Sequence, residues 1–169
     1  MSNKLGKATD QRLALLKNQV SYLLWNGKIE TTYARAKAIQ KLADKYLTLA
    51  INTYQDVIKV TKNKKVKGVD TKVEVLNDGP TKLSARRRLM ASLSDMQETK
   101  GKKESLTAYK LRTEDVKHPL IEKMFNEYAP KFDKRAQELG QKGGYTTVHN
   151  LGMRRGDAAE MALIEILPI

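Results

Sequence analysis

The sequence contains no cysteine and only two histidines, and aromatic residues make up 6% of its 169 residues. Without cysteine, disulfides and thiolate metal sites are excluded. His118 and His149 are far apart in the sequence and do not have the spacing of a metal site. We therefore expect no metal and no other cofactor.

Long apolar runs are also absent. No stretch approaches the roughly 20 apolar residues of a membrane-spanning helix, and residues 1–11 lack the apolar centre of a signal peptide. We expect a cytoplasmic protein that has no membrane partner.

Acidic residues are outnumbered, with 19 Asp+Glu against 32 Lys+Arg and a formal net charge of +13. Such an excess points to a polyanionic partner, with nucleic acid favoured over an anionic membrane or a merely solubilising charge. A chain of this length can bury about 70% of its unfolded surface. We expect one domain, 1–169, with one sizeable insertion.

The N-terminal quarter predicts a helix, a short strand and a second helix. In residues 10–26, apolar residues recur at spacings of three and four, namely Leu13, Leu16, Val20, Leu23 and Leu24. Trp25 falls on the opposite side of this helix, where we expect solvent. Gly27 is typical of a helix C-terminus, residues 29–32 favour a strand, and residues 33–53 predict an amphipathic helix.

The middle of the chain predicts a hairpin followed by a helix. Residues 57–61 and 71–75 alternate with period two, so we expect a hairpin over about 57–76 whose tip is rich in lysine. A helix then begins near Pro80, with Leu83, Met90, Leu93 and Met96 as its expected apolar side. Arg86, Arg87 and Arg88 span 200° of that helix, so at least one of them should be solvated or salt-bridged rather than facing the partner.

The C-terminal third predicts a helix and two strands. A helix can begin at Pro119, with an interruption expected at Ala129–Pro130. Residues 143–149 and 157–166 read as antiparallel strands, which together with 29–32 could form a small mixed sheet. We therefore expect an α+β fold of two layers, with the helices on one face of the sheet and the hairpin as an inserted arm.

Motifs of catalysis are missing from the sequence. The glycines at 140, 143 and 144 are not followed by the Gly-Lys-Ser/Thr of a phosphate loop, and no serine lies in a nucleophile-elbow sequence. We expect neither an enzyme nor a small-molecule substrate.

Both ends of the chain are similar to one known family. The stretches that carry the similarity are Leu5–Lys7, Gln11–Asn18, Gly27–Thr32, Ala36–Lys37, Phe125–Glu127, Pro130–Phe132, Gly143–Thr146, Arg155–Ala159 and Met161–Glu165. In order and spacing, over residues 1–53 and 118–166, they resemble the seventeenth protein of the bacterial large ribosomal subunit.

The resemblance implies a non-catalytic protein of two-layer α/β fold. It would be a structural constituent of the ribosome, binding large-subunit ribosomal RNA near the peptide exit, with neighbouring ribosomal proteins as further partners. The family's middle is often far shorter, so residues 54–117 are interpreted as a lineage-type insertion. Competing interpretations are a DNA-compacting nucleoid protein and a membrane-surface protein, the second disfavoured by the C-terminal strands.

Phosphate neutralisation by lysine and arginine is the expected source of RNA affinity, since few aromatics are available for base stacking. The predicted RNA-binding residues are Lys4, Lys7, Arg12, Lys17, Lys28, Arg35 and Lys37 around the first helix, and Lys64, Lys65 and Lys67 in the hairpin.

Overall fold

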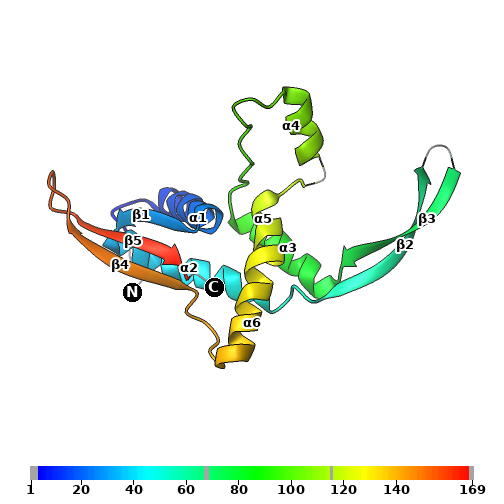
Figure 1. The fold of residues 1–169 in the computed structure, drawn as a ribbon. Helices are drawn as coiled ribbons and strands as arrows, with labels where there is room; N and C mark the ends of the chain where they lie inside the picture. The colour runs from blue at the N-terminus through cyan, green and yellow to red at the C-terminus, as the bar shows by residue number, and fades with distance from the viewer. Residues whose placement is uncertain (1–3, 67–68, 115, 168–169) are drawn as a thin grey trace.

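The chain opens with the predicted order of helix, strand and helix (Figure 1). The computed structural model describes residues 4–66, 69–114 and 116–167, with side chains except at 62–66 and 69–73. The first elements are α1 (Thr9–Asn26), β1 (Lys28–Thr32) and α2 (Tyr33–Ile51). Gly27 ends α1 in the left-handed conformation, φ 82°, and its N–H donates to the carbonyl of Leu23. A glycine takes this conformation without steric cost, so the chain can reverse directly into β1.

The two halves of the chain meet in a three-stranded sheet of order β1-β5-β4. β4 (Thr146–Met153) and β5 (Glu160–Ile166) form a hairpin, and β1 pairs with the other edge of β5, with Ile29 opposite Ile164. Both pairings are antiparallel. The prediction of a mixed sheet was wrong on this point, because alternation within a strand does not encode its direction.

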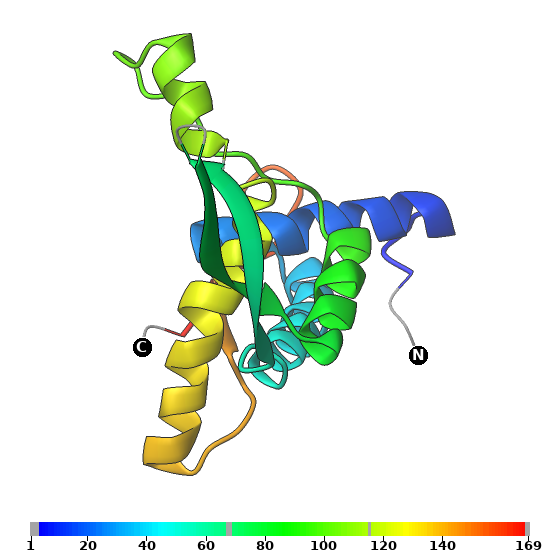
Figure 2. The same cartoon turned by 90° about the vertical axis from the view of Figure 1, so that its right-hand side faces the viewer.

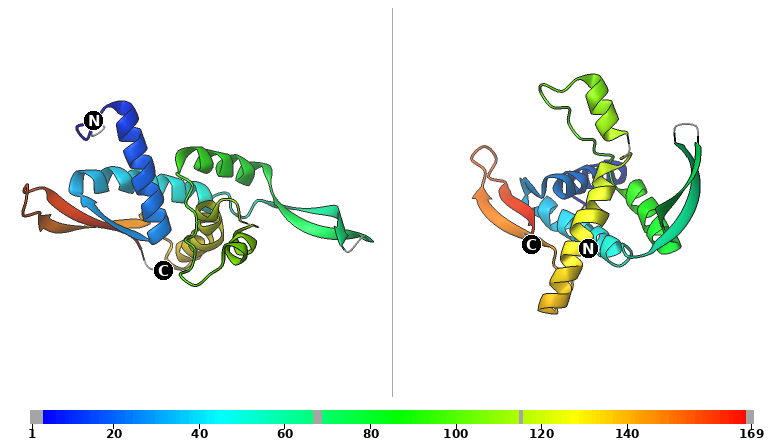
Figure 3. Two further views of the ribbon diagram at one scale, coloured as in Figure 1. Left: turned by 90° about the horizontal axis from the view of Figure 1, so that it is seen from above. Right: turned by 45° about the vertical axis from the view of Figure 1, so that its right-hand side comes forward.

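One face of the sheet is covered by helices, which confirms the two-layer α+β arrangement (Figure 3). Thr31, Ala162 and Ile164 are buried on this face, under α1 and α2. The fully buried side chains that these helices contribute to the core are Val20, Leu23, Leu24, Ala36, Ile39, Ala43, Leu47 and Ala50.

The apolar stripe of α1 is only partly buried. Leu13 is 60% exposed, because the N-terminal part of α1 projects beyond the body of the molecule (Figure 2). Trp25, expected in solvent, is half-buried and packs against the core. The predictions for Leu13 and Trp25 used only their positions around the helix, and both were wrong, because the core covers only the C-terminal part of α1.

A helix runs without interruption through the predicted break at Ala129–Pro130 (Figure 1). It comprises α5 (Pro119–Lys123), the π-turn η1 (Met124–Tyr128) and α6 (Ala129–Leu139). In the π-turn the N–H of Ala129 donates to the carbonyl of Met124, five residues earlier. This wider turn accommodates Pro130, which has no N–H to donate. Beyond this turn, Phe132 in α6 is buried in the core.

The predicted hairpin is confirmed and is longer than expected. β2 (Val57–Val66) pairs with β3 (Val69–Asp78) in a separate two-stranded sheet, which extends away from the body (Figures 1 and 3). α3 (Pro80–Ser92) and α4 (Leu106–Thr113) follow it.

The buried side of α3 differs from the prediction. Ala85 and Leu89 are buried, whereas Leu83 and Met90 are 37% and 40% exposed. Leu93, which directly follows the helix, is buried as expected. α3 therefore packs through a narrow strip of every fourth residue.

Candidate nucleic-acid interface

The first group of predicted cations lies at the projecting end of α1. Lys4 and Lys7 are exposed before the helix, and Arg12 is half-buried, with its guanidinium 3.5 Å from Thr9 Oγ1. Lys17 has a structural contact, since its Nζ donates to the carbonyl of Ala91 at 3.3 Å and so joins α1 to the end of α3.

The second group lies on β1 and the start of α2. Lys28 is exposed at the first position of β1, and Arg35 is half-buried on α2. Lys37 is exposed, with its Nζ 5.5 Å from the centre of the Tyr33 ring. These side chains add a second group of cations, on β1 and α2, to those near the start of α1.

Two further cations of α2, Lys41 and Lys45, were not among the predicted RNA-binding residues. Lys37, Lys41 and Lys45 are spaced by four and are all exposed on α2. Like charges at this spacing repel one another and weaken a helix slightly. Asp44 lies beside this row but is half-buried and accepts a hydrogen bond from Thr146 Oγ1, so the three exposed lysines are available to bind an anion. The repetition itself was the available signal.

The hairpin carries the remaining predicted residues. The backbones of Lys64 and Lys65 lie in β2, paired with Thr71 and Asp70, and their side chains fall outside the described part of the chain. Lys67 also lies outside the described residues. The hairpin extends to the opposite side of the molecule from α1 and β1, so the predicted cations do not form a single patch (Figure 1).

Pairing with acids separates the cations into two classes. Among the described residues, none of the seven predicted cations between Lys4 and Lys37 takes part in an ion pair. The cations that do are Lys82 and Arg86 with Asp78, Arg86 with Glu122, Arg112 with Glu98 and Glu104, Lys134 with Glu138, and Arg154 with Asp157. Apart from Lys17, which is bound to the Ala91 carbonyl, these unpaired residues have no acid partner that would compete with phosphate.

Arg154 and Asp157 illustrate the paired class at the β4–β5 turn. Nε and Nη2 of Arg154 donate to the two carboxylate oxygens of Asp157 at 2.9 and 2.6 Å. These hydrogen bonds lower the pKa of Asp157 to about 2. The neighbouring Arg155 is exposed and, within the described residues, has no ion-pair partner.

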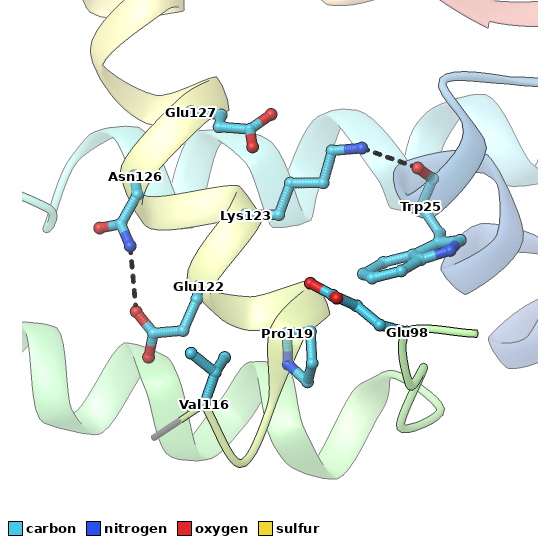
Figure 4. Close-up of a pocket in the computed structure, with 8 residues that line it drawn as sticks. All are labelled: Trp25, Glu98, Val116, Pro119, Glu122, Lys123, Asn126 and Glu127. Atoms are coloured by element: carbon cyan, nitrogen blue, oxygen red, sulfur yellow. Dashed lines mark hydrogen bonds between the residues drawn. The ribbon is translucent and has the colours of Figure 1, made fainter. Parts of the chain in front are cut away.

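A hollow between α1 and α5 has the opposite electrostatic character. Its volume is about 410 Å³, and Glu98, Glu122 and Glu127 lie around it (Figure 4). Lys123 spans it, with Nζ donating to the Trp25 carbonyl at 2.8 Å and lying 5.6 Å from the Trp25 ring centre. Three carboxylates make this side a poor surface for a polyanion.

Titratable groups in the body serve packing and capping. Burial raises the pKa of Asp44, partly offset by a hydrogen bond from Thr146 Oγ1. The Asp56 carboxylate accepts hydrogen bonds from the side chain and the N–H of Thr81, which lower its pKa and satisfy the start of α3. Across residues 4–66, 69–114 and 116–167, no group of three or more His, Asp or Glu side chains is arranged to hold a metal ion.

No helix within the described ranges is both long and apolar enough to cross a membrane. That a membrane is not a partner stays a prediction.

Comparison with known proteins gives a consistent assignment. The family model described as ribosomal protein L17 matches residues 15–167. The large ribosomal subunit protein bL17 of Lachnospira eligens is 35% identical over 184 aligned positions, which cover 97% of each chain. Those of Acetivibrio thermocellus and Clostridium acetobutylicum are 31% and 33% identical, covering 97% of this chain and 97% and 95% of theirs. A DNA-compacting role receives no support from these similarities, and the chain belongs to the ribosomal protein L17 family.

Proposed function

We propose that this protein is a structural, non-catalytic constituent of the large ribosomal subunit, where it binds and stabilises ribosomal RNA. Its relatives are named as large-subunit proteins, and family resemblance suggests a place near the peptide exit, beside other ribosomal proteins in the cytoplasm. The observation that carries the proposal is the set of exposed lysines without acid partners before α1, at the start of β1 and along α2, in a chain of net charge +13.

Affinity then comes from neutralising phosphates, which releases counterions from the RNA. Shape and 2′-hydroxyl contacts to folded RNA set the orientation. The hairpin lysines at positions 64, 65 and 67 would add a second contact region at a distance from the first. As part of the same proposal, residues 54–117 are an insertion into a single domain, relative to shorter members of the family.

A salt titration tests the role of the unpaired cations. The double variant Lys37→Gln/Lys41→Gln removes two exposed cations of α2, and Arg112→Gln/Lys134→Gln removes two that already have acid partners. Binding to large-subunit ribosomal RNA is measured at several salt concentrations. For the α2 variant, we expect the slope of log K against log salt to become shallower by about 2, since each lost phosphate contact removes about 1.

The paired-cation variant should keep the slope of the wild-type protein. A wild-type affinity that hardly changes with salt would contradict phosphate neutralisation as the main source of binding. Equal slopes for both variants would contradict the assignment of the contact to α2. Sedimentation of the full chain with large subunits on a sucrose gradient tests the ribosomal location separately.

A further inference from the structure

Two adjoining hollows form a groove between α1, α2 and the end of α3. Their volumes are about 570 and about 270 Å³, and both are lined by Tyr46, Ala91 and Ser92. Seen from above, α3 lies alongside α2, and α1 crosses near the end of α3 (Figure 3, left). We call this the α1–α2–α3 groove.

The floor of the groove is apolar. Leu16, Leu42, Tyr46 and Leu49 line it and are all half-buried against the core. The Tyr46 hydroxyl forms no hydrogen bond within the described part of the chain. Tyr46, shared by both hollows, therefore offers an aromatic surface and a free polar group at the centre of the groove.

The edges of the groove are positive. Lys45 and Arg88 are exposed on α2 and α3, and neither takes part in an ion pair within the described residues. No acid lines either hollow. The other described hollows each include a carboxylate, for example Asp133 between α2 and α6 and Asp95 beside α3. The absence of acids therefore distinguishes this groove.

We propose that the α1–α2–α3 groove holds an unpaired nucleotide of the RNA, with its base against Tyr46 and its flanking phosphates on Lys45 and Arg88. This inference rests on the proposed function and names a site within it. An apolar, aromatic floor suits a base face, whereas a duplex hides its base faces by stacking. The lysine row of α2 continues from Lys45 away from the groove. The regularly spaced phosphates of an RNA strand therefore complement this row better than an apolar peptide does.

The experiment combines binding with chemical probing of unpaired bases, using large-subunit ribosomal RNA transcribed in vitro as the probe. Tyr46→Leu keeps the apolar volume but removes the aromatic face, and Tyr46→Phe keeps the ring. Wild type and Tyr46→Phe should protect the same few unpaired bases. Tyr46→Leu should leave those bases reactive and weaken binding about 5- to 100-fold, as for loss of one stacking aromatic.

A second pair of variants separates the phosphate contacts from the fold. Lys45→Gln/Arg88→Gln should make the salt slope shallower by about 2, while Arg112→Gln/Lys134→Gln leaves it unchanged. Thermal unfolding midpoints near that of the wild-type protein verify that each variant is folded.

Three results would overturn the inference while leaving the proposed function intact. These are salt-dependent wild-type binding without protection of any unpaired base, protection retained by Tyr46→Leu, and cross-linking of the groove in assembled subunits to a protein instead of RNA. Failure of the proposed function has a different signature, namely wild-type protein that does not bind the RNA at all.

Discussion

Arg86 links three elements through one side chain. Its Nε donates to Asp78 at the end of β3 at 2.5 Å, its Nη1 donates to Glu122 in α5, and its guanidinium lies 5.2 Å from the Phe125 ring centre. Burial by itself raises the pKa of Asp78, but hydrogen bonds from Arg86 and Lys82 outweigh it, and the pKa lies below its ordinary value. At least one arginine of the run was expected to be solvated or salt-bridged, and Arg86 is salt-bridged.

Replacing Arg86 by methionine should destabilise the protein, because Glu122 would lose its ion-pair partner and the partly buried Asp78 would keep only Lys82. We expect the free energy of unfolding to fall by about 1–3 kcal/mol, less than for a fully buried pair because these groups retain some solvent contact. Arg87→Met, at the exposed neighbouring position, should change it by about 0.5 kcal/mol or less. Urea unfolding at pH 7 measures both.

The effect of Arg86→Met should depend on pH. Asp78 has a lower pKa in the folded than in the unfolded protein, so its contribution to stability is present above the unfolded pKa and is lost as pH falls through the folded pKa. The stability difference between wild type and Arg86→Met should therefore shrink below about pH 4. An unchanged difference would mean that Arg86 acts through packing on Phe125 instead of through charge.

Elements with a local signal in the sequence were the ones that could be predicted. Gly27 as a helix end and the alternation at 57–61 each depend on neighbouring residues, and both predictions were confirmed. The buried side of α3 depends instead on the elements it packs against: Leu83 and Met90 are more apolar than Ala85, yet they are 37% and 40% exposed whereas Ala85 is buried. The spacing of apolar residues in the sequence alone could not reveal which side of α3 is buried.

The same limit applies to the candidate interface. The cations before α1 and at the start of α2 were recognisable, because they form a dense basic stretch on either side of the helix end and strand at residues 27–32. The proximity of Lys45 to Arg88 was not, because these two residues come together only when α3 packs beside α2. Hydrogen bonding also changed the interpretation of Lys17, whose contact with the Ala91 carbonyl gives it a structural role.

The β2–β3 hairpin is an arm with few contacts to the body. Its strands pair only with each other, and Ile58 and Leu76 near its base are 48% and 67% exposed. The base is fixed by polar contacts, since Gly79 N–H donates to the Asp56 carbonyl and Asp78 pairs with Arg86. The arm beyond this base therefore contributes little to the core.

Shortening the arm should separate RNA affinity from stability. Ile58 and Asn77 are paired, so residues 59–76 can be replaced by Asn-Gly, which suits a two-residue hairpin turn. We expect a nearly unchanged thermal unfolding midpoint and weaker binding to large-subunit ribosomal RNA, because the lysine-rich arm is lost while Asp56 and Asp78 remain. A large fall in the midpoint with unaltered RNA binding would contradict this and make the arm a packed structural element.

At the scale of the whole molecule, the fold is closed by contact between the two ends of the chain. β5 is the central strand of the sheet, with β1 on one side and β4 on the other. Gln40 in α2 donates to the carbonyl of Thr146 at 3.0 Å, and Ile166 N–H donates to the carbonyl of Gly27. β1 therefore has a pairing strand only when the C-terminal strands are in place.

Truncation after Gly140 should for this reason unfold the domain rather than trim it. The removed segment carries the buried residues Tyr145, Ala162 and Ile164, and its loss leaves β1 as an unpaired strand. The shortened-arm variant is the matched control, because it also removes a long segment but one outside the core. Circular dichroism on heating should show a cooperative transition for the control and none for the truncated chain. If the truncated chain kept a cooperative transition with native-like helix content, α1 and α2 would form a core without the sheet.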